Sequence, residues 1–299
     1  MKRLIWLLLW LAVLGCAPGP QSTATSPAAP AAVSAPQALT LATTTSTQDS
    51  GLLDVLIPRF EKQFNVKVKV VAVGTGQALK LGTDGNADVV LVHARQQEDA
   101  FVSAGDGIYR RDVMYNDFII VGPSADPAKI ASVKLAADAF RQIANTQSPF
   151  ASRGDQSGTN TKELAIWKAA SITPNGGWYL SLGQGMGETL TFANERGAYT
   201  LSDRATWLAQ KAKLPSLAVT VGGNRIEENA DKSLLNPYGV IPVNPAKHPT
   251  VNNKLAEQFA VWLTALDTQK FIAQFGMDQY GQSLFHPDSA EWHQANPTQ

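Results

Sequence analysis

The chain has 299 residues, of which 44% are hydrophobic and 17% are charged. Its formal net charge of +0 provides no global field for nucleic acid or an anionic membrane surface, so we expect no nucleic-acid partner. The single cysteine excludes a disulfide within one chain. Length and composition therefore indicate a globular protein with one large domain or two lobes.

The N-terminus has the pattern of a secretion signal. Lys2 and Arg3 precede an apolar run over residues 4–14, which is short for a bilayer span. The run ends at Cys16, and a small residue followed by cysteine resembles the bacterial lipoprotein processing signal. The resemblance implies that residues 1–15 are a cleaved signal peptide and that the thiol of Cys16 is acylated. The alternative is a plain secretory signal with an incidental cysteine.

Residues 16–37 are predicted to be the lipidated cysteine and a flexible tether. After Cys16 this segment is rich in Pro, Ala, Ser and Thr, and Val33 is its one large apolar side chain. Lipid chains would hold the protein at a membrane surface without a spanning helix. We therefore expect an extracytoplasmic or periplasmic protein that is anchored to the membrane as a lipoprotein.

Predicted strands and helices alternate after the tether. Strands are expected at residues 38–42, 66–73, 87–92, 113–121, 150–152 and 238–243. Helices are expected at residues 98–104, 136–144 and 189–196, and one long helix at 253–275, while residues 219–223 interrupt the pattern. Pro58 either kinks a helix that starts at Leu52 or marks its true start. The alternation predicts an α/β fold with mostly parallel sheets flanked by helices.

The stretch from Arg153 to Thr159 is the leading candidate for anion binding. Ser157, Gly158 and Thr159 open an amphipathic helical pattern, and a helix N-terminus has unpaired N–H groups and a partial positive charge. Gly158 lets the backbone approach closely, and the hydroxyls add donors. Arg153 adds a forked cation suited to an oxyanion. The alternative is an ordinary capped helix with a surface arginine.

Similar clusters follow other predicted strands. In α/β sheets, ligands bind at the carboxyl ends of strands beside helix N-termini, so several clusters are expected to converge on one cavity. The candidates are Thr44, Thr45 and Ser46 in a run of five hydroxyl residues, Thr75 and Gly76 after the second strand, His93 after the third, and Ser202. The alternatives are a polar N-cap with surplus threonines and, for His93, a histidine with a purely structural role.

In combination, these motifs resemble the tungstate-binding proteins of bacterial ABC transporters. The resemblance covers residues 38–285. It is carried by Thr43-Thr44-Thr45-Ser46, Gly74-Thr75-Gly76, residues 87–94, residues 114–118, Arg153 with Ser157-Gly158-Thr159, and residues 199–204. It implies a two-lobed type II periplasmic-binding-protein fold that clamps a dehydrated tetrahedral oxyanion in the cleft between the lobes. The implied contacts are Thr44, Thr45, Ser46, Thr75, Arg153 and Thr159, with Ser157 and Gly158 between the last two.

The resemblance also implies an organisation and a set of partners. Lobe 1 is expected to comprise residues 38–120 and 238–299, and lobe 2 residues 121–237. The ligand is tungstate or molybdate, which the sequence alone does not rank, and the macromolecular partner is a membrane permease. We expect a monomer that needs no cofactor and no metal.

Phosphate is the alternative ligand, because the Arg-x-x-x-Ser-Gly-Thr spacing also resembles that of phosphate-binding transport proteins. Phosphate keeps a proton at neutral pH and needs an acceptor, whereas tungstate and molybdate carry none, so a pocket of donors suits them. The phosphate family would have a Ser-Asp pair after the third strand, where this chain has His93 and Ala94. Asp155 is the remaining candidate acceptor.

An enzyme is not expected. A secreted hydrolase would need an activated nucleophile, and the sequence contains no G-x-S-x-G elbow. The four histidines match no recognised catalytic or zinc spacing; they are His93, His248, His286 and His293. A sensory or adhesive lipoprotein with the same fold is a third alternative.

Overall fold

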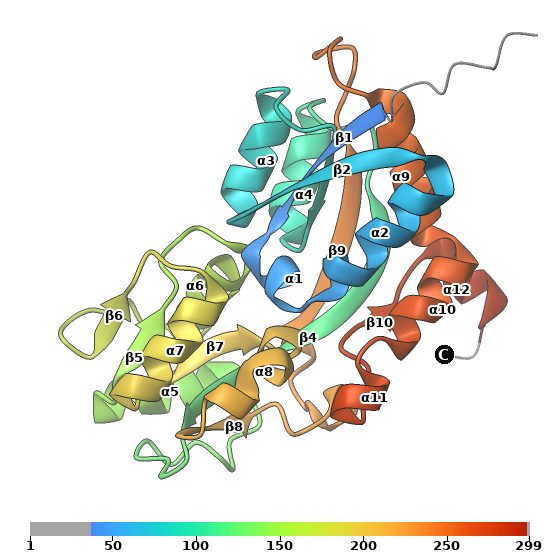
Figure 1. Ribbon diagram of the computed structural model, residues 1–299. Coiled ribbons are helices and arrows are strands. Elements are labelled where there is room, and N and C mark those ends of the chain that lie inside the picture. The colour runs from blue at the N-terminus through green and yellow to red at the C-terminus, as the bar shows by residue number, and fades with distance from the viewer. Residues whose placement is uncertain (1–36, 298–299) are drawn as a thin grey trace, which may run out of the picture. The chain divides into compact units, whose positions relative to one another are not determined.

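The computed structural model describes residues 37–297 of the chain. The predicted signal peptide, Cys16 and nearly all of the predicted tether therefore lie outside the described residues. Within the described part, strands and helices alternate along most of the sequence, as Figure 1 shows. None of the helices found there combines the length and the apolar character that crossing a membrane requires.

The bounds of the elements follow the sequence pattern for most of the chain. The strands are β1 (Gln37–Thr44), β2 (Val66–Val73), β3 (Val89–Val92), β4 (Arg111–Pro123), β5 (Phe150–Ser152), β6 (Tyr179–Ser181), β7 (Thr200–Asp203), β8 (Leu217–Val221), β9 (Leu235–Pro242) and β10 (His286–Pro287). The helices are α1 (Thr45–Asp49), α2 (Leu52–Phe64), α3 (Thr75–Thr83), α4 (Arg95–Ser103), α5 (Ala136–Thr146), α6 (Gly158–Ala169), α7 (Met186–Arg196), α8 (Arg204–Gln210), α9 (Asn253–Thr264), α10 (Leu266–Gln274), α11 (Met277–Tyr280) and α12 (Ala290–Ala295). Short 3-10 helices cover Lys211–Lys213, Ile226–Glu228 and Lys232–Leu234.

The first strand group is built around β1, which has β2 and β3 as parallel neighbours. Parallel pairing needs a crossover connection, which α2 and α3 supply. β3 then pairs antiparallel with β9, and β9 pairs antiparallel with residues 111–117 of β4. Leu39 and Leu41 of β1 are buried together with Phe60 of α2 and Phe259 of α9, whose rings meet edge to face at 5.0 Å. This core fixes the strand ends at which Thr44 and Thr75 lie.

The second strand group is built around the rest of β4. Residues 118–123 pair antiparallel with β7 and β8, while β5 and β6 form a separate parallel pair. Phe140 of α5, Phe150 of β5 and Trp167 of α6 are buried, with ring centroids 4.3 to 5.2 Å apart. This aromatic cluster holds α5 and α6 against β5 and so positions the turn that carries Arg153.

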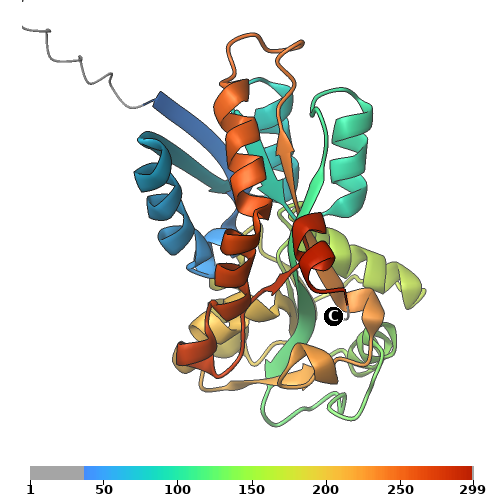
Figure 2. The same ribbon diagram turned by 90° about the vertical axis from the view of Figure 1, so that its right-hand side faces the viewer.

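The two groups share β4, which Figure 2 shows as one continuous green strand. Its partner changes from β9 to β7 between Asp117 and Phe118. Asp117 is fully buried there and pairs with Arg204, with Nε–Oδ1 and Nη2–Oδ2 distances of 2.7 Å each. The guanidinium also donates to the carbonyls of Gly222 and Gly223. A bidentate ion pair of this kind fixes both partners in orientation, so it anchors α8 where β4 changes neighbour.

The predicted α/β class is confirmed, but the sheets are mixed rather than mostly parallel. Three strand pairs are parallel and five are antiparallel. The reason is that the long strands β4 and β9 pair with each other in opposite directions, and each has further antiparallel neighbours. The predicted helix at 253–275 is two helices, because Ala265 has an extended ψ of 146°. Pro58 lies inside α2, which begins at Leu52.

Candidate anion-binding site

Two capped helices begin at strand ends near each other. β1 ends at Thr44, and Thr44 Oγ1 accepts the N–H of Thr47 over 3.2 Å to cap α1. Ser157 caps α6 after β5 by accepting the N–H of Asn160 over 3.1 Å. Both are side chains that favour the N-cap position. The hydroxyl clusters of the sequence therefore lie at helix starts, where the backbone dipoles favour negative charge.

The turn between β5 and α6 directs Arg153 inward. Gly154 has a φ of 62°, and a Cβ there would lie 2.1 Å from the Ser181 hydroxyl, so this position requires glycine. Asp155 closes the turn: its Oδ1 accepts the N–H of Ser157 over 3.2 Å, and its Oδ2 accepts Nη2 of Arg153 over 2.6 Å. Arg153 is only 1% exposed, so it is a buried cation rather than a surface arginine.

The hydrogen-bonding capacity of Arg153 is only partly used by the protein. Its Nη2 also donates to Thr45 Oγ1 over 3.0 Å. In the described part of the chain, its Nε and Nη1 have no partner, and neither does the buried hydroxyl of Thr159. A buried polar group without a partner costs about 1–3 kcal/mol, and more when it is charged. These three groups therefore point to an acceptor that the protein itself does not contain.

Segments from both strand groups meet beside these donors. The N–H of Gly158 in α6 donates to Thr75 Oγ1 in α3 over 2.9 Å. A Cβ on Gly158 would lie 2.8 Å from Nδ1 and 3.0 Å from the carbonyl oxygen of His93, so this contact is as close as glycine permits. Thr206 Oγ1 of α8 donates to the carbonyl of Ser46 over 3.3 Å. The candidate site is consequently assembled from both strand groups.

His93 supports the hydroxyl cluster. Its Nδ1 lies 3.0 Å from Asn236 Oδ1, while its Nε2 lies 3.1 Å from Thr44 Oγ1 and 3.0 Å from Ser46 Oγ. Because the amide oxygen only accepts, Nδ1 carries the proton and Nε2 accepts from a hydroxyl. Burial, assisted by the charge of Arg153, lowers the pKa of His93 to about 4, so the ring is neutral at physiological pH. This geometry matches the structural role considered as the alternative for His93.

A chain of side-chain hydrogen bonds continues from His93 into the second strand group. Asn236 Nδ2 donates to Asn116 Oδ1 over 2.7 Å, and Asn116 Nδ2 donates to Asp203 Oδ1 over 3.4 Å. Asn236 belongs to β9 and Asn116 to β4, the two strands that extend between the groups. All four side chains are at least 96% buried, since none is more than 4% exposed. Sequence reasoning missed both asparagines and Asp203, because their partners lie far away in the chain.

An acidic flank borders the Thr45 end of the site. Gly185 precedes α7, and a Cβ on it would lie 3.5 Å from Thr45 Oγ1. Asp49 of α1 and Glu188 of α7 line a neighbouring groove of 620 Å³. Burial, Glu188 and Asp203 raise the pKa of Asp49 to about 6, against the opposing charge of Arg153. An anion at Arg153 would therefore depend on local donors and not on a surplus of positive charge.

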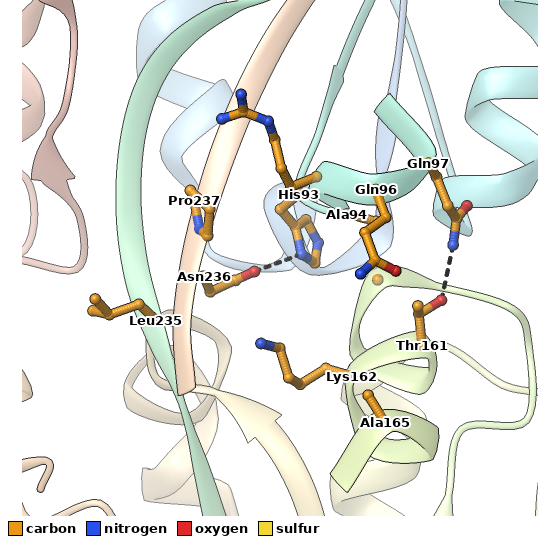
Figure 3. A pocket seen from close by; sticks show the side chains of 12 residues that line it. His93, Ala94, Gln96, Gln97, Thr161, Lys162, Ala165, Leu235, Asn236 and Pro237 are labelled. Carbon is orange, nitrogen blue, oxygen red and sulfur yellow. Dashed lines mark hydrogen bonds between the residues drawn. The ribbon is translucent and has the colours of Figure 1, made fainter. Parts of the chain in front are cut away.

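A second groove, of 460 Å³, borders the site through His93 and Gly158. Figure 3 shows Gln97 of α4 donating to Thr161 of α6 at one end of it, over 2.9 Å. Lys162 lines the groove as well, and its Nζ donates to the carbonyl of Ser233 over 2.7 Å. Neither groove is lined by Arg153 or Thr159, whose buried donors have no partner within residues 37–297. We therefore place the candidate site at those donors.

Most of the sequence-predicted residues lie in this one cluster. Hydrogen bonds and close approaches connect most of them, and Thr159 follows directly in α6; the connected residues are Thr44, Thr45, Ser46, Thr75, His93, Arg153, Ser157 and Gly158. Gly76 lies at the edge, where a Cβ would be 3.6 Å from the Gln156 carbonyl. Ser202 Oγ donates to the Asp203 carbonyl over 2.9 Å. Their contacts with a ligand stay predictions. Residues 37–297 contain no group of three or more His, Cys, Asp or Glu side chains arranged for a metal ion.

Comparison with known proteins agrees with the resemblance seen in the sequence. The chain matches the model of the PBP superfamily domain over residues 24–266. It is 46% identical over 301 residues to the tungstate-binding protein TupA of Peptoclostridium acidaminophilum, an alignment covering 97% of this chain and 100% of that protein. The predicted resemblance is therefore confirmed at the level of sequence.

Solved structures show the same likeness. The tungstate ABC transporter structure from Geobacter sulfurreducens has a TM-score of 0.72 and 52% identity, covering 80% of this chain and 98% of that one. The tungstate-binding protein TupA from Desulfovibrio alaskensis G20 has a TM-score of 0.68 and 43% identity, covering 85% and 99%. The predicted periplasmic-binding-protein fold is thus confirmed.

Proposed function

We propose that this chain, which belongs to the PBP superfamily, is the extracytoplasmic substrate-binding component of an ABC transporter and captures tungstate, with molybdate as the second candidate. Relatives similar over nearly their whole length are named for tungstate binding. The proposal makes the chain a binding protein rather than an enzyme. Its partners are the oxyanion and a membrane permease, and it acts as a monomer.

One observation carries the proposal: a buried arginine has two nitrogens without a partner beside a buried, unpartnered hydroxyl. Arg153 Nε and Nη1 and Thr159 Oγ1 are donors that a tetrahedral oxyanion would satisfy together. Hydrogen bonds to a charged group contribute roughly 1.5–3 kcal/mol each, so several of them offset the several-kcal/mol desolvation of the ion. An anion in this position explains why the donors are buried without protein partners.

We assign direct contacts to the donors that surround Arg153. These are the side chains of Thr45, Ser46, Ser157 and Thr159 and the first turn of α6 at Gly158. Thr75 acts by accepting the Gly158 N–H, which aligns that turn. Thr44 has its hydroxyl engaged by the cap of α1 and by His93, so we assign it chiefly to holding Ser46 in place.

The two groups considered as acceptors for the phosphate proton already make hydrogen bonds within the protein. The acceptor expected for its proton was Asp155, but each oxygen of that carboxylate already accepts a protein N–H, one from Arg153 and one from Ser157. His93 is the other group near the position where the phosphate family carries an acid, and its ring is committed to Asn236 and the hydroxyls. A fully deprotonated oxyanion such as tungstate needs no such acceptor.

Capture requires the two strand groups to separate and close. We propose that residues 38–120 with 238–299 form one lobe and residues 121–237 the other, and that β4 and β9 bend where they pass between them. Contacts such as Gly158 to Thr75 hold the lobes together when the anion is present. The closed form is the one that docks on the permease, because it is selected by bound ligand.

We also propose that the protein is a lipoprotein. Residues 1–15 would be removed, Cys16 acylated, and the tether to residue 37 would link the membrane anchor to the binding domain. Mass spectrometry of the membrane-extracted protein tests this, since acylation of Cys16 gives an N-terminal peptide of defined added mass. An unmodified N-terminal Cys16, or cleavage at another residue, would contradict it.

The function is tested by calorimetric titration of the protein, freed of bound anion, with tungstate, molybdate, sulfate and phosphate in one buffer. We expect tight binding of tungstate and no heat from sulfate or phosphate. The ratio of tungstate to molybdate affinity then ranks these two ligands. Tight phosphate binding would replace the ligand while leaving the site, and silence with all four anions would reject the transport-receptor function.

A further inference from the structure

Asp203 is a buried carboxylate that the donor set above leaves unused. It ends β7 and caps α8, and its Oδ1 accepts the Thr206 N–H over 2.8 Å and an N–H of Asn116 over 3.4 Å. The residue is 0% exposed, and its Oδ2 has no hydrogen-bond partner anywhere in residues 37–297. Because a helix cap uses one carboxylate oxygen, capping does not account for Oδ2.

Asp203 and Arg153 belong to one electrostatic cluster but do not pair with each other. Each of them shifts the titration of both Asp49 and Tyr238, so the four side chains lie within range of one another. The carboxylate that pairs with Arg153 is nevertheless that of Asp155, over 2.6 Å. Asp203 caps the first turn of α8, and Thr206 in that turn donates through Oγ1 to the Ser46 carbonyl over 3.3 Å. The unpartnered Oδ2 of Asp203 therefore lies in the same buried region as the hydroxyl cluster of the site.

The charge of an anion bound beside Asp203 would set the protonation state of its carboxyl group. A tetrahedral dianion without protons would be repelled by an ionised Oδ2, whereas a protonated Oδ2 donates a hydrogen bond to it. We propose that Asp203 binds the oxyanion as a neutral carboxylic acid, and that closure around the anion takes up one proton from solvent onto Oδ2. This inference rests on the proposed function, and the proton is released to solvent when the lobes open.

The surroundings of Asp203 favour the neutral acid. Burial raises the pKa of Asp203 above its ordinary value, while the Thr206 N–H and the Arg153 charge oppose that shift. The charge of Arg153 is already compensated by Asp155, and a bound dianion would raise the pKa of Asp203 further. Other titratable or charged groups face this region. Asp49 lies on α1, Glu188 on α7 and Tyr238 on β9, and the neutral ring of His93 follows β3. Asp117 of β4 and Arg204 of α8 pair with each other.

Proton uptake is measured by titrating tungstate into the full-length protein in buffers of equal pH and different ionisation enthalpy, such as HEPES and Tris. We expect a net uptake of protons with each anion bound, and a Kd that rises with pH by up to about tenfold per pH unit. In Asp203→Asn the amide Nδ2 is a permanently neutral donor. That variant should bind with no buffer dependence and with a Kd that does not change with pH.

Two further variants separate Asp203 from its neighbourhood. Asp49→Asn removes the other nearby carboxylate with a raised pKa and should still take up the proton. Asp203→Ser keeps an N-cap side chain for α8 but has no carboxyl group to protonate, so it should lose the proton uptake. It replaces Asp203→Asn as the test if the amide variant does not fold. If Asp203 had only a structural role, these variants would differ from the wild type in melting temperature, but the number of protons taken up per anion would stay the same.

The outcomes distinguish the inference from the function on which it rests. Tight tungstate binding by the wild type without proton uptake would overturn the inference alone. Proton uptake that survives in Asp203→Asn and disappears in Asp49→Asn would move the titrating group to Asp49 and also overturn it. Tight phosphate binding would make Oδ2 an ionised acceptor, and no binding of tungstate would reject the function and the inference together.

Discussion

The backbone N–H of Gly158 donates to the hydroxyl of Thr75 over 2.9 Å, although the two residues are 83 positions apart in the chain. The contact joins the first turn of α6 in one strand group to the start of α3 in the other. It also aligns the helix start that follows Arg153. The hydroxyl of Thr75 therefore connects the two strand groups at the candidate anion site.

Replacing Thr75 with valine should weaken tungstate binding by roughly 1–3 kcal/mol, because the Gly158 N–H loses its acceptor when the lobes close. Calorimetric titration gives the affinity directly. Thr75→Ser retains a hydroxyl and should bind close to wild type, which separates the hydrogen bond from packing. Equal loss in both variants would contradict this assignment.

Gly158→Ala should impair binding more than a usual surface change, since its Cβ would lie 2.8 Å from Nδ1 of His93 and 3.0 Å from the backbone oxygen of that residue. We expect a loss of at least about tenfold in affinity, because either the lobes stop short of closure or α6 shifts away from Arg153. The matched control is Gly177→Ala, which adds a Cβ with no heavy atom within 4 Å. Wild-type affinity in both variants would show that the close approach is not needed.

Two buried arginines should give opposite phenotypes. Arg153→Ala should weaken binding by roughly 2–4 kcal/mol, the scale for truncating one partner of a buried charged contact. Arg204→Ala should instead lower the free energy of unfolding by roughly 3–5 kcal/mol, because Asp117 is left buried without its partner. Titration and thermal melting of both variants make the comparison. Weakened tungstate binding by a stably folded Arg204→Ala variant would contradict this assignment of a binding role to Arg153 and a structural role to Arg204.

Tungstate should compact the protein. Separation of the strand groups would break contacts such as Arg153 to Thr45 and Gly158 to Thr75, so small-angle scattering should give a smaller radius of gyration with ligand. Arg153→Ala serves as the control and should show little change at the same tungstate concentration. An unchanged radius for the wild type at saturation would exclude closure as the response to ligand.

His93 makes the stability depend on pH in a predictable direction. Its pKa is lowered to about 4 in the folded protein from an ordinary value of 6.5, so the unfolded chain binds the proton more readily. The stabilisation is complete above pH 6.5 and is lost as the pH falls toward 4, by roughly 3 kcal/mol in total.

The measurement for His93 is the difference in unfolding free energy between wild type and His93→Gln across this pH range. The difference is needed because Glu98 and Asp49, whose pKa values are raised to about 6, act in the opposite sense. A difference that stays constant with pH would show that His93 is not buried in the neutral form.

Much of the site could be predicted because local patterns determine it. Thr44 ends an apolar strand and Ser157 follows one after a short turn. Both are good N-cap residues, so the sequence alone predicts hydroxyls at helix starts. Parallel pairing of β1 with β2 and β3 then brings the corresponding strand ends to one edge. Arg153 follows β5 into the same region because Gly154 permits the required turn.

The rest depends on contacts between distant segments. Asp203 has the local pattern of a helix cap, and nothing near it in sequence indicates that Oδ2 lacks a partner. Ala265 separates α9 from α10 without a proline or glycine at the break, so periodicity predicts one helix. β8 was missed because Gly222 and Gly223 follow it directly and obscure a short strand, and mixed pairing through β4 has no local signature.

The line of side chains from His93 through Asn236 and Asn116 to Asp203 has a fixed polarity. Each amide accepts on one side and donates on the other, and the last donor ends on a carboxylate oxygen that can only accept when ionised. Reversing one amide would set two donors or two acceptors face to face at its neighbours. The line therefore connects the hydroxyl cluster beside His93 with the cap of α8 at Asp203, and a substitution at either asparagine would change the hydrogen bonding at both ends.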